Sequence, residues 1–312
     1  MTHGAERGAA PSLDAFGFTP NRPPSEAGLP PEIALSPSAG PLVGGARWIA
    51  AGVGDVPDIG LLEGDVVYRL PGVCQLRIPI DGHEIRLHVE PGADAEAVRW
   101  LLVRGIMPRV LQLRGVPCLH ASAVAGPAGL ICFAAESGGG KSALAAAMVR
   151  RGYRLVGDDI VPVRIASETP MGGPGLEDIW LHPDVAERVG VGLGRPAPGP
   201  PSEKRAWRPP EDLIESTPQP IRTVFVLRAR PPRNPPAPAA RRGPVLAAPA
   251  AFRSLVEQSM WIHPAVPRAM ERAMPVLERM AQAVVVRSLF VQLDRRGLEA
   301  AARLVARECR DA

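Results

Sequence analysis

Hydrophobic and polar positions alternate with a period of two through residues 66–89, which is the spacing of half-buried β-strands. Pro-Gly and Asp-Gly dipeptides interrupt the alternation, and such dipeptides favour turns. They divide the stretch into segments 66–70, 74–78 and 84–89. The pattern therefore predicts a small antiparallel β-meander.

The spacing then becomes helical over residues 94–102 and 106–113. Asp94 is a suitable N-cap residue, and Gly105 lies between the two stretches. We therefore predict two helices separated at Gly105.

The centre of the chain predicts strands that flank one Ala- and Leu-rich helix, which Gly152 closes as a C-cap. A Gly-Pro-Ala-Gly turn at 126–129 separates the first two strands. In chain order we expect strands at 118–125 and 130–134, the helix at 141–151, and strands at 154–156 and 160–165.

The rest of the chain is less regular. Residues 1–42 are rich in Pro, Gly, Ala and Ser and predict a disordered tail, and 230–250 predict a flexible Pro-rich loop. We expect one short helix at 183–189, strands at 221–227 and 283–290, and otherwise helix from 251 to a last helix at 297–309. The predicted domains are a small α+β region at 43–115 and a larger domain at 116–312.

Composition narrows the possible functions. The 312 residues are 46% hydrophobic, enough for a sizeable core, and carry a net charge of +4. The basic residues are scattered, so we expect no nucleic-acid partner. There is no basic start followed by an apolar run, and no apolar stretch approaches the roughly 18 residues of a membrane span, so we predict a cytoplasmic protein without a membrane partner.

One bias singles out two residues. The chain has 34 arginines but only two lysines, Lys141 and Lys204. A lysine kept against such a bias suggests a position that needs a compact ammonium rather than a planar guanidinium. Lys204 is a candidate functional residue on this ground, and the alternative is a surface lysine left by chance.

The strongest chemical signal is the segment AESGGGKS at residues 135–142. It matches the Walker A pattern G-x-x-x-x-G-K-[ST] except that Ala135 replaces the first glycine. Glycines let backbone amides turn towards phosphate oxygens, the lysine reaches the β and γ phosphates, and the serine can ligate Mg²⁺. The predicted nucleotide-binding residues are Ser137, Gly138, Gly139, Gly140, Lys141 and Ser142, with Lys204 added from the composition.

Two acidic residues follow the next strand. Asp158 and Asp159 come 17 and 18 residues after Lys141. In a parallel sheet that strand would end at the same edge as the phosphate loop, where a carboxylate can hold Mg²⁺ or accept a proton. A solvated acidic turn is the alternative. His120 lies among apolar residues and is either a core residue or a member of the site.

Several of these motifs occur in the order found in a known family. A His-containing strand, a hairpin, the glycine-rich loop, a helix ending in Arg151-Gly152, a hydrophobic strand and Asp158-Asp159 together resemble the catalytic domain of HPr kinase/phosphorylase. The resemblance is strong over residues 119–163. The flanks resemble smaller family members, among them kinases that phosphorylate a serine of a lasso-peptide precursor.

The resemblance implies an α/β fold: a P-loop mixed sheet of the HPr kinase and PEP-carboxykinase type, with an N-terminal β-meander and C-terminal helices. It implies an ATP- and Mg²⁺-dependent kinase acting on a hydroxyl, with serine in a ribosomal peptide precursor as the expected acceptor. Asp158 would be the general base, Ser142 and Asp159 would assist Mg²⁺, and His120 would border the reacting phosphate with Lys141. The family's hexameric members imply homo-oligomerisation.

Two departures leave other functions open. Family members usually have Glu after the loop serine, where this chain has Ala143, and their downstream glycine-rich signature, linked to the reverse reaction, is not recognisable here. A non-catalytic nucleotide-binding scaffold is one alternative. A kinase for a small-molecule hydroxyl is the other.

Overall fold

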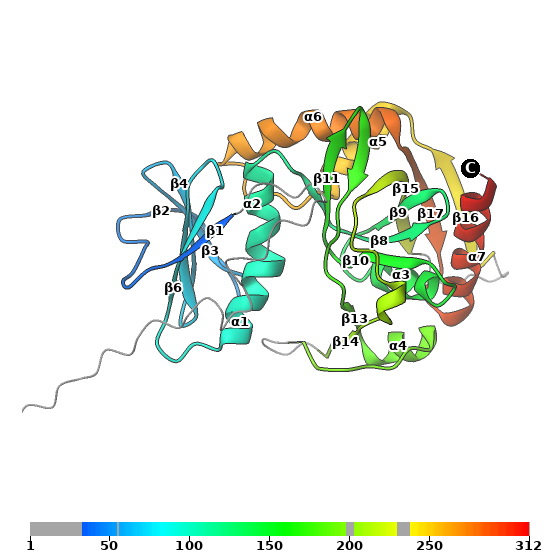
Figure 1. Ribbon diagram of the computed structural model, residues 1–312, viewed down its shortest axis with the longest axis horizontal. Coiled ribbons are helices and arrows are strands. Elements are labelled where there is room, and N and C mark those ends of the chain that lie inside the picture. The colour runs from blue at the N-terminus through cyan, green and yellow to red at the C-terminus, as the bar shows by residue number, and fades with distance from the viewer. Residues whose placement is uncertain (1–32, 55, 198–202, 230–237, 312) are drawn as a thin grey trace, which may run out of the picture. The chain divides into compact units, whose positions relative to one another are not determined.

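The computed structural model describes residues 33–54, 56–197, 203–229 and 238–311. By its internal contacts the chain divides into two compact units (Figure 1). Unit 1 comprises residues 1–110 with 198–200, and unit 2 comprises 111–197 with 201–312. The division falls within helix α2 (Met107–Leu113), and the sequence placed it at residues 115 and 116. Each unit is described by itself.

Unit 1 contains a six-stranded sheet in the order β1-β6-β5-β4-β3-β2. The predicted meander is present: β4 pairs antiparallel with β5, and β5 with β6. Alternate side chains of β5 are buried, as the period of two requires. The strands are β1 (Ala34–Pro37), β2 (Arg47–Ala50), β3 (Asp58–Leu62), β4 (Asp65–Leu70), β5 (Cys74–Ile78) and β6 (Glu84–Val89).

Strand β1 corrects the prediction of a disordered tail up to residue 42. It pairs parallel with β6, and Ala34 lies opposite Glu84. Four residues have too weak a local pattern to predict a strand, and the pairing comes from a neighbour fifty residues away in sequence. Residues 1–32, the rest of the predicted tail, lie outside the described residues.

The helical stretch of this region is also corrected. We predicted a break at Gly105, but helix α1 (Ala95–Trp100) continues through a π-helical turn, η2 (Leu101–Ile106), into α2. A π-turn accommodates one extra residue without ending the helix. The predicted cap is present, because the Asp94 side chain accepts the Glu96 N–H at 3.0 Å.

Unit 2 is built on a mixed sheet of nine strands. Its main path runs β10-β8-β9-β15-β17-β16, in which β15 is parallel to both β9 and β17 and the other pairs are antiparallel. The expected mixed α/β architecture is therefore confirmed. These strands are β8 (Ala121–Gly126), β9 (Gly129–Ala134), β10 (Arg154–Gly157), β15 (Gln219–Ala229), β16 (Ala240–Val245) and β17 (Val285–Val291).

A second branch leaves the start of β15 and runs β15-β12-β11-β7. A separate two-stranded sheet, β13-β14, lies in the stretch that we predicted to be irregular apart from one helix. The branch consists of β7 (Cys118–Leu119), β11 (Val161–Ala166) and β12 (Thr169–Gly172), and the small sheet of β13 (Ile179–Leu181) and β14 (Arg205–Trp207).

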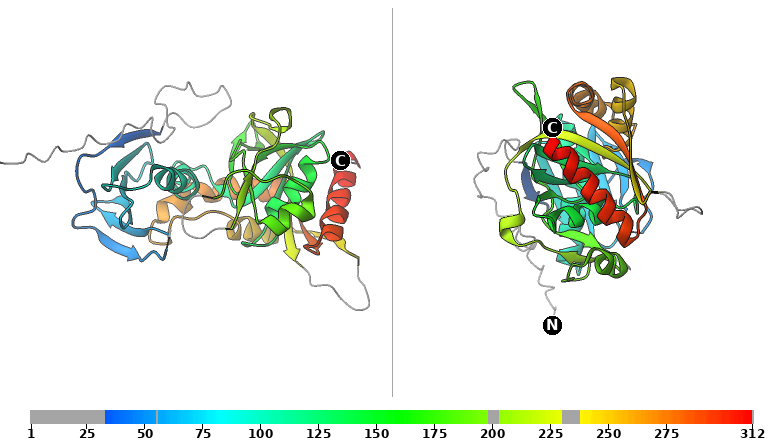
Figure 2. Two further views of the ribbon diagram at one scale, coloured as in Figure 1. Left: turned by 90° about the horizontal axis from the view of Figure 1, so that it is seen from below. Right: turned by 90° about the vertical axis from the view of Figure 1, so that its right-hand side faces the viewer.

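Helices cover both faces of the main sheet. Phe133 and Phe225 point to the face covered by α3 and α7, whereas Cys132, Val224 and Val226 point to the face covered by α5 and α6. Figure 1 and the right-hand view of Figure 2 show this arrangement, with α7 in front of the sheet in the latter. The helices are α3 (Lys141–Val149), α4 (Pro183–Val189), the short 3₁₀-helix η3 (Glu211–Leu213), α5 (Ala248–Glu257), α6 (Pro267–Ala283) and α7 (Arg295–Asp311).

Two further predictions need correction. The predicted strand 118–125 is broken at His120, because β7 pairs with β11 whereas β8 pairs with β9 and β10. The predicted flexible loop 230–250 contains β16 and the start of α5, and the described part begins at residue 238. In each case pairing with a strand distant in sequence overrides the local signal. None of the described helices combines the length and apolar composition needed to cross a lipid bilayer.

Candidate functional site

The predicted site residues meet at one edge of the main sheet of unit 2. Strand β9 ends before the glycine-rich loop, β10 ends before Asp158, and β8 begins after His120. Sequence reasoning assumed parallel neighbours, but β8 lies between β9 and β10 and is antiparallel to both. Two antiparallel pairings return β10 to the direction of β9, so the ends of both strands and the start of β8 share this edge.

Glycine-specific geometry shapes the loop between β9 and α3. Gly138 and Gly140 have φ angles of 77° and 92°. These angles favour glycine, because glycine has no Cβ atom to clash with the backbone. A Cβ added at Gly139 would lie 2.6 Å from that of Ala135, which is too close. The alanine that replaces the first motif glycine therefore requires glycine at 139. Ala135 and the three glycines are therefore compatible with a loop whose backbone amides turn inward towards a phosphate.

Lys141 opens helix α3 and is only 6% exposed. Its ammonium donates to the carbonyl oxygens of Ala135 at 2.9 Å and Glu136 at 3.3 Å, folding back over the loop. Burial lowers the pKa of Lys141, while the charges of Asp159 and Asp158 oppose that shift. An anion bound to the loop would lie next to this ammonium and would offset the cost of burying its charge.

Asp158 is almost fully buried, with 1% of its surface exposed. Its Oδ1 accepts the Ser122 hydroxyl at 2.6 Å. Its Oδ2 accepts the Ser142 hydroxyl at 3.2 Å and the Trp180 backbone N–H at 3.3 Å. The carboxylate thus lies behind the loop serine and does not line the cavity.

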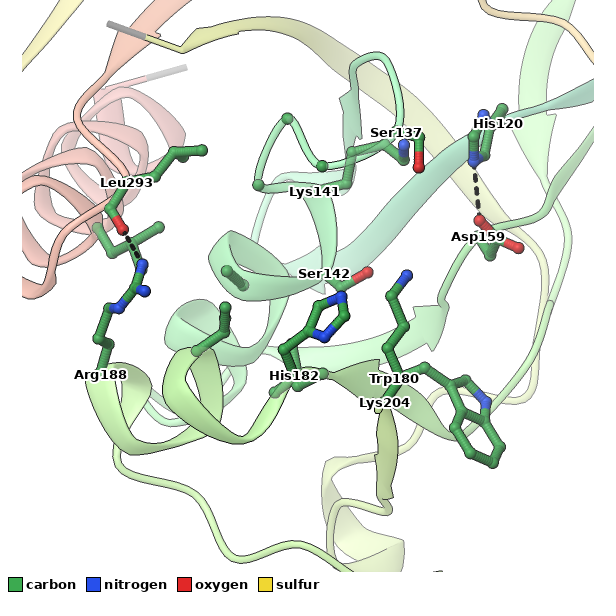
Figure 3. Close-up of a pocket in the computed structure, with 17 residues that line it drawn as sticks. His120, Ser137, Lys141, Ser142, Asp159, Trp180, His182, Arg188, Lys204 and Leu293 are labelled. Atoms are coloured by element: carbon green, nitrogen blue, oxygen red, sulfur yellow. Dashed lines mark hydrogen bonds and ion pairs between the residues drawn. The ribbon is translucent and has the colours of Figure 1, made fainter. Parts of the chain in front are cut away.

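Asp159 has the opposite orientation and faces the open space beside the loop. Its φ of 71° is left-handed, which aspartate tolerates better than most residues, and such conformations recur at functional sites. Its Oδ1 lies 2.8 Å from Nε2 of His120 (Figure 3). The His120 backbone N–H donates to Gln258 O at 2.7 Å, which holds the histidine at the break between β7 and β8. The structure therefore places His120 beside Asp159 in the lining of the candidate site.

A cavity of about 290 Å³ joins these groups. The loop, His120 and Asp159 form one side, and the other side comes from β13, α4 and the residue before β14. Lys204 points from that wall towards Ser142, beside His182 (Figure 3). Both lysines of the chain therefore line this cavity. Of the predicted site residues, Asp158 is the one that the cavity lining does not include.

Apart from Lys204, sequence reasoning missed the wall opposite the loop, and it missed the hydroxyl that lies behind the loop serine. The Arg188 guanidinium donates to Leu293 O at 2.9 Å and so connects α4 to the turn after β17. These residues come from segments far apart in sequence, in stretches without a motif, so no local signal identified them. Ser122 lies within the predicted strand 118–125, but only its contact with Asp158 gives it significance. The missed residues are Ser122, Trp180, His182, Arg188 and Leu293.

The oxygen atoms of the site's side chains suit a hard cation whose other ligands are phosphate oxygens. Among the described residues, no three His, Cys, Asp or Glu side chains gather as a metal cage. Mg²⁺ is usually held by one or two carboxylates together with substrate phosphates and water. The Ser142 hydroxyl, with Asp158 behind it and Asp159 nearby, fits that pattern.

No family model and no curated protein matches the sequence. Among solved structures, the Hpr(Ser) kinase/phosphatase from Coxiella burnetii is similar at 14% identity and a TM-score of 0.32. The match covers 62% of this chain and 99% of that chain. That protein bears the name of the family whose motif order residues 119–163 resemble.

Proposed function

We propose that this chain is an ATP- and Mg²⁺-dependent phosphotransferase that transfers a phosphoryl group to a hydroxyl. One observation carries the proposal: a single cavity contains a glycine-rich loop at a helix N-terminus, the loop lysine and serine, and a carboxylate next to a histidine. A helix N-terminus with turned backbone amides favours a phosphate anion. Phosphoryl transfer requires mainly positioning and charge stabilisation, which this set of groups supplies.

On the phosphate side, the loop amides and Lys141 would hold the β and γ phosphates. Ser142 and the carboxylate of Asp158 behind it would hold Mg²⁺, which when bound neutralises charge on the phosphate oxygens. Lys204 would approach the phosphates from the opposite wall. Its charge adds to that of Lys141 in the same cavity, as its lowering effect on the Lys141 pKa indicates.

On the acceptor side, the geometry favours Asp159 over Asp158 as the group that receives the hydroxyl proton. Asp159 lines the cavity and contacts His120, whereas Asp158 is buried and accepts hydrogen bonds from Ser122, Ser142 and Trp180. A general base must reach the proton that it accepts. This assignment exchanges the roles that the family resemblance implies for the two aspartates.

The acceptor class follows from the resemblance alone. We propose a serine of a ribosomal peptide precursor, with a small-molecule hydroxyl as the competing acceptor. The departure at Ala143 motivates the scaffold alternative, in which nucleotide binds without turnover.

The test is mass spectrometry of acceptors incubated with the full chain, ATP and Mg²⁺. We expect a gain of one phosphoryl group on the precursor peptide, and transfer to free serine or a sugar instead would identify a small-molecule kinase. Tight nucleotide binding without any product would contradict the proposal.

The two aspartates are separated by amide substitutions. We expect Asp159→Asn to lower kcat by about 10²–10⁴-fold. Asp158→Asn should mainly raise the Mg²⁺ concentration needed for half-maximal rate. Asp212→Asn, an exposed carboxylate in η3 of the same unit, is the matched control and should behave like wild type. If Asp158→Asn instead lowers kcat by that factor without changing the Mg²⁺ concentration needed for half-maximal rate, and Asp159→Asn keeps the wild-type kcat, then Asp158 is the base.

A further inference from the structure

Ser122 lies in strand β8, directly behind the candidate site, and its surface is fully buried. Its hydroxyl donates to Oδ1 of Asp158 at 2.6 Å. Its neighbours in the strand, Ala121, Ala123 and Val124, all have apolar side chains. Burying a hydroxyl without a hydrogen-bond partner costs free energy. The hydrogen bond to Asp158 therefore explains why serine is tolerated at this buried position.

The hydrogen bonds to Asp158 are unequal. The contact from Ser122 is 2.6 Å, whereas those from Ser142 and the Trp180 backbone are 3.2 and 3.3 Å. Hydrogen bonds to an ionised carboxylate are stronger when they are short. Ser122 therefore fixes the carboxylate from behind, and the looser contact leaves the Ser142 hydroxyl available to a ligand in the cavity.

We propose that Ser122 is a positioning residue: through Asp158 it orients the Ser142 hydroxyl and so sets the Mg²⁺-dependent part of nucleotide binding. This inference rests on the proposed function of the same site. Ser122 does not line the cavity, and it acts through Asp158 without touching nucleotide. When its hydroxyl is absent, the carboxylate can rotate away from Ser142, and the metal loses a preorganised ligand.

The test measures the affinity of the full chain for a fluorescent ATP analogue, once with Mg²⁺ and once with EDTA. Ser122→Ala removes the hydroxyl at almost unchanged volume. We expect affinity with Mg²⁺ to fall about tenfold or more, as for loss of a hydrogen bond to a charged group. Affinity in EDTA should stay unchanged. Ser254→Ala, another buried serine of unit 2, is the matched control and should change neither.

A double-mutant cycle identifies the path of the effect. In the Asp158→Asn background, Ser122→Ala should cause no further loss, because both changes break the same connection. Ser122→Thr keeps the hydroxyl and should retain Mg²⁺-dependent binding, which covers the case in which the alanine variant folds poorly.

The outcomes separate this inference from the proposed function. Wild type that fails to bind nucleotide overturns both. Wild type that binds with Mg²⁺ while Ser122→Ala matches it overturns only the positioning role. Equal losses with Mg²⁺ and with EDTA, or full additivity with Asp158→Asn, would indicate a general packing role and also overturn it.

Discussion

At the residue scale, the two lysines of the chain share one cavity. Lys141 reaches it from the start of α3 and Lys204 from the residue before β14. The chain uses arginine at 34 other basic positions, most of them outside the cavity. An ammonium is compact and its donors rotate, whereas a guanidinium is planar and longer. This difference is a physical reason to expect lysine rather than arginine at these two positions.

Lys204 can be tested by two substitutions. Lys204→Met should lower kcat/KM about 10–100-fold, the loss of one charged contact to a phosphate. Lys204→Arg should not restore it, because a planar guanidinium does not present the compact, rotatable charge of an ammonium. Steady-state kinetics would measure both, with Arg303→Met on the exposed side of α7 as control. Full activity of Lys204→Arg would show that only charge matters there.

Lys141 couples function to stability. Since burial lowers its pKa, its charge costs free energy in the folded state. At pH 7 we expect Lys141→Met to abolish nucleotide binding without lowering the free energy of unfolding. Wild type should then gain stability relative to the variant as pH rises from the lowered native pKa towards about 10.5, the unfolded value.

Urea denaturation of wild type and Lys141→Met, without nucleotide, would measure this at several pH values. The sign follows from proton uptake: across that interval the unfolded chain binds more protons than the native chain, so stability increases with pH. If the free energies of unfolding of the two proteins differed by the same amount throughout this pH interval, the prediction would be contradicted.

At the element scale, the predicted strand-loop-helix unit is present because its local signals agree. The apolar strand β9, the glycines and the Ala-rich helix α3 each favour the structure that they adopt. The predictions of an unbroken strand over 118–125 and of a helix break at Gly105 were wrong. The strand divides because β7 pairs with β11 while β8 pairs with β9, and the helix continues through the π-turn η2. Pairings between strands distant in sequence also determine which residues face the cavity.

The loop should show coupling between positions 135 and 139. A Cβ at Gly139 would meet Ala135 Cβ at 2.6 Å and Glu136 O at 3.0 Å. We therefore expect Gly139→Ala to weaken nucleotide binding by about tenfold or more, as steric strain of 1–3 kcal/mol would. Ala135→Gly alone should bind like wild type, and combined with Gly139→Ala it should recover part of the loss. Calorimetric titration of the four proteins measures the coupling, and full additivity would contradict the contact.

At the scale of the whole molecule, all candidate residues belong to unit 2, from His120 to Lys204 together with Leu293. The edge of the sheet brings together the ends of three strands, and α4 closes the opposite side. A ligand in this cavity would therefore contact segments spread over most of that unit.

Nucleotide should accordingly stabilise unit 2. With ATP and Mg²⁺ at 100 times Kd, we expect the free energy of unfolding to rise by about 2.7 kcal/mol. For a unit of this size that is a rise in Tm of roughly 5–10 °C. Differential scanning calorimetry would measure it, with Lys141→Met as the variant that should not respond. An equal rise in that variant would indicate binding elsewhere.

The sequence by itself determined the glycine-rich loop, the helix after it and the acidic pair after the next strand, because each is encoded in consecutive residues. The order of these motifs also indicated the mixed α/β class. Only the tertiary structure decided which aspartate faces the cavity, that Ser122 holds the other, and that Lys204, His182 and Arg188 form the opposite wall. The physical reason is that side-chain direction at a sheet edge depends on strand order and on turn conformation. Both are set by pairings between segments that no local pattern connects.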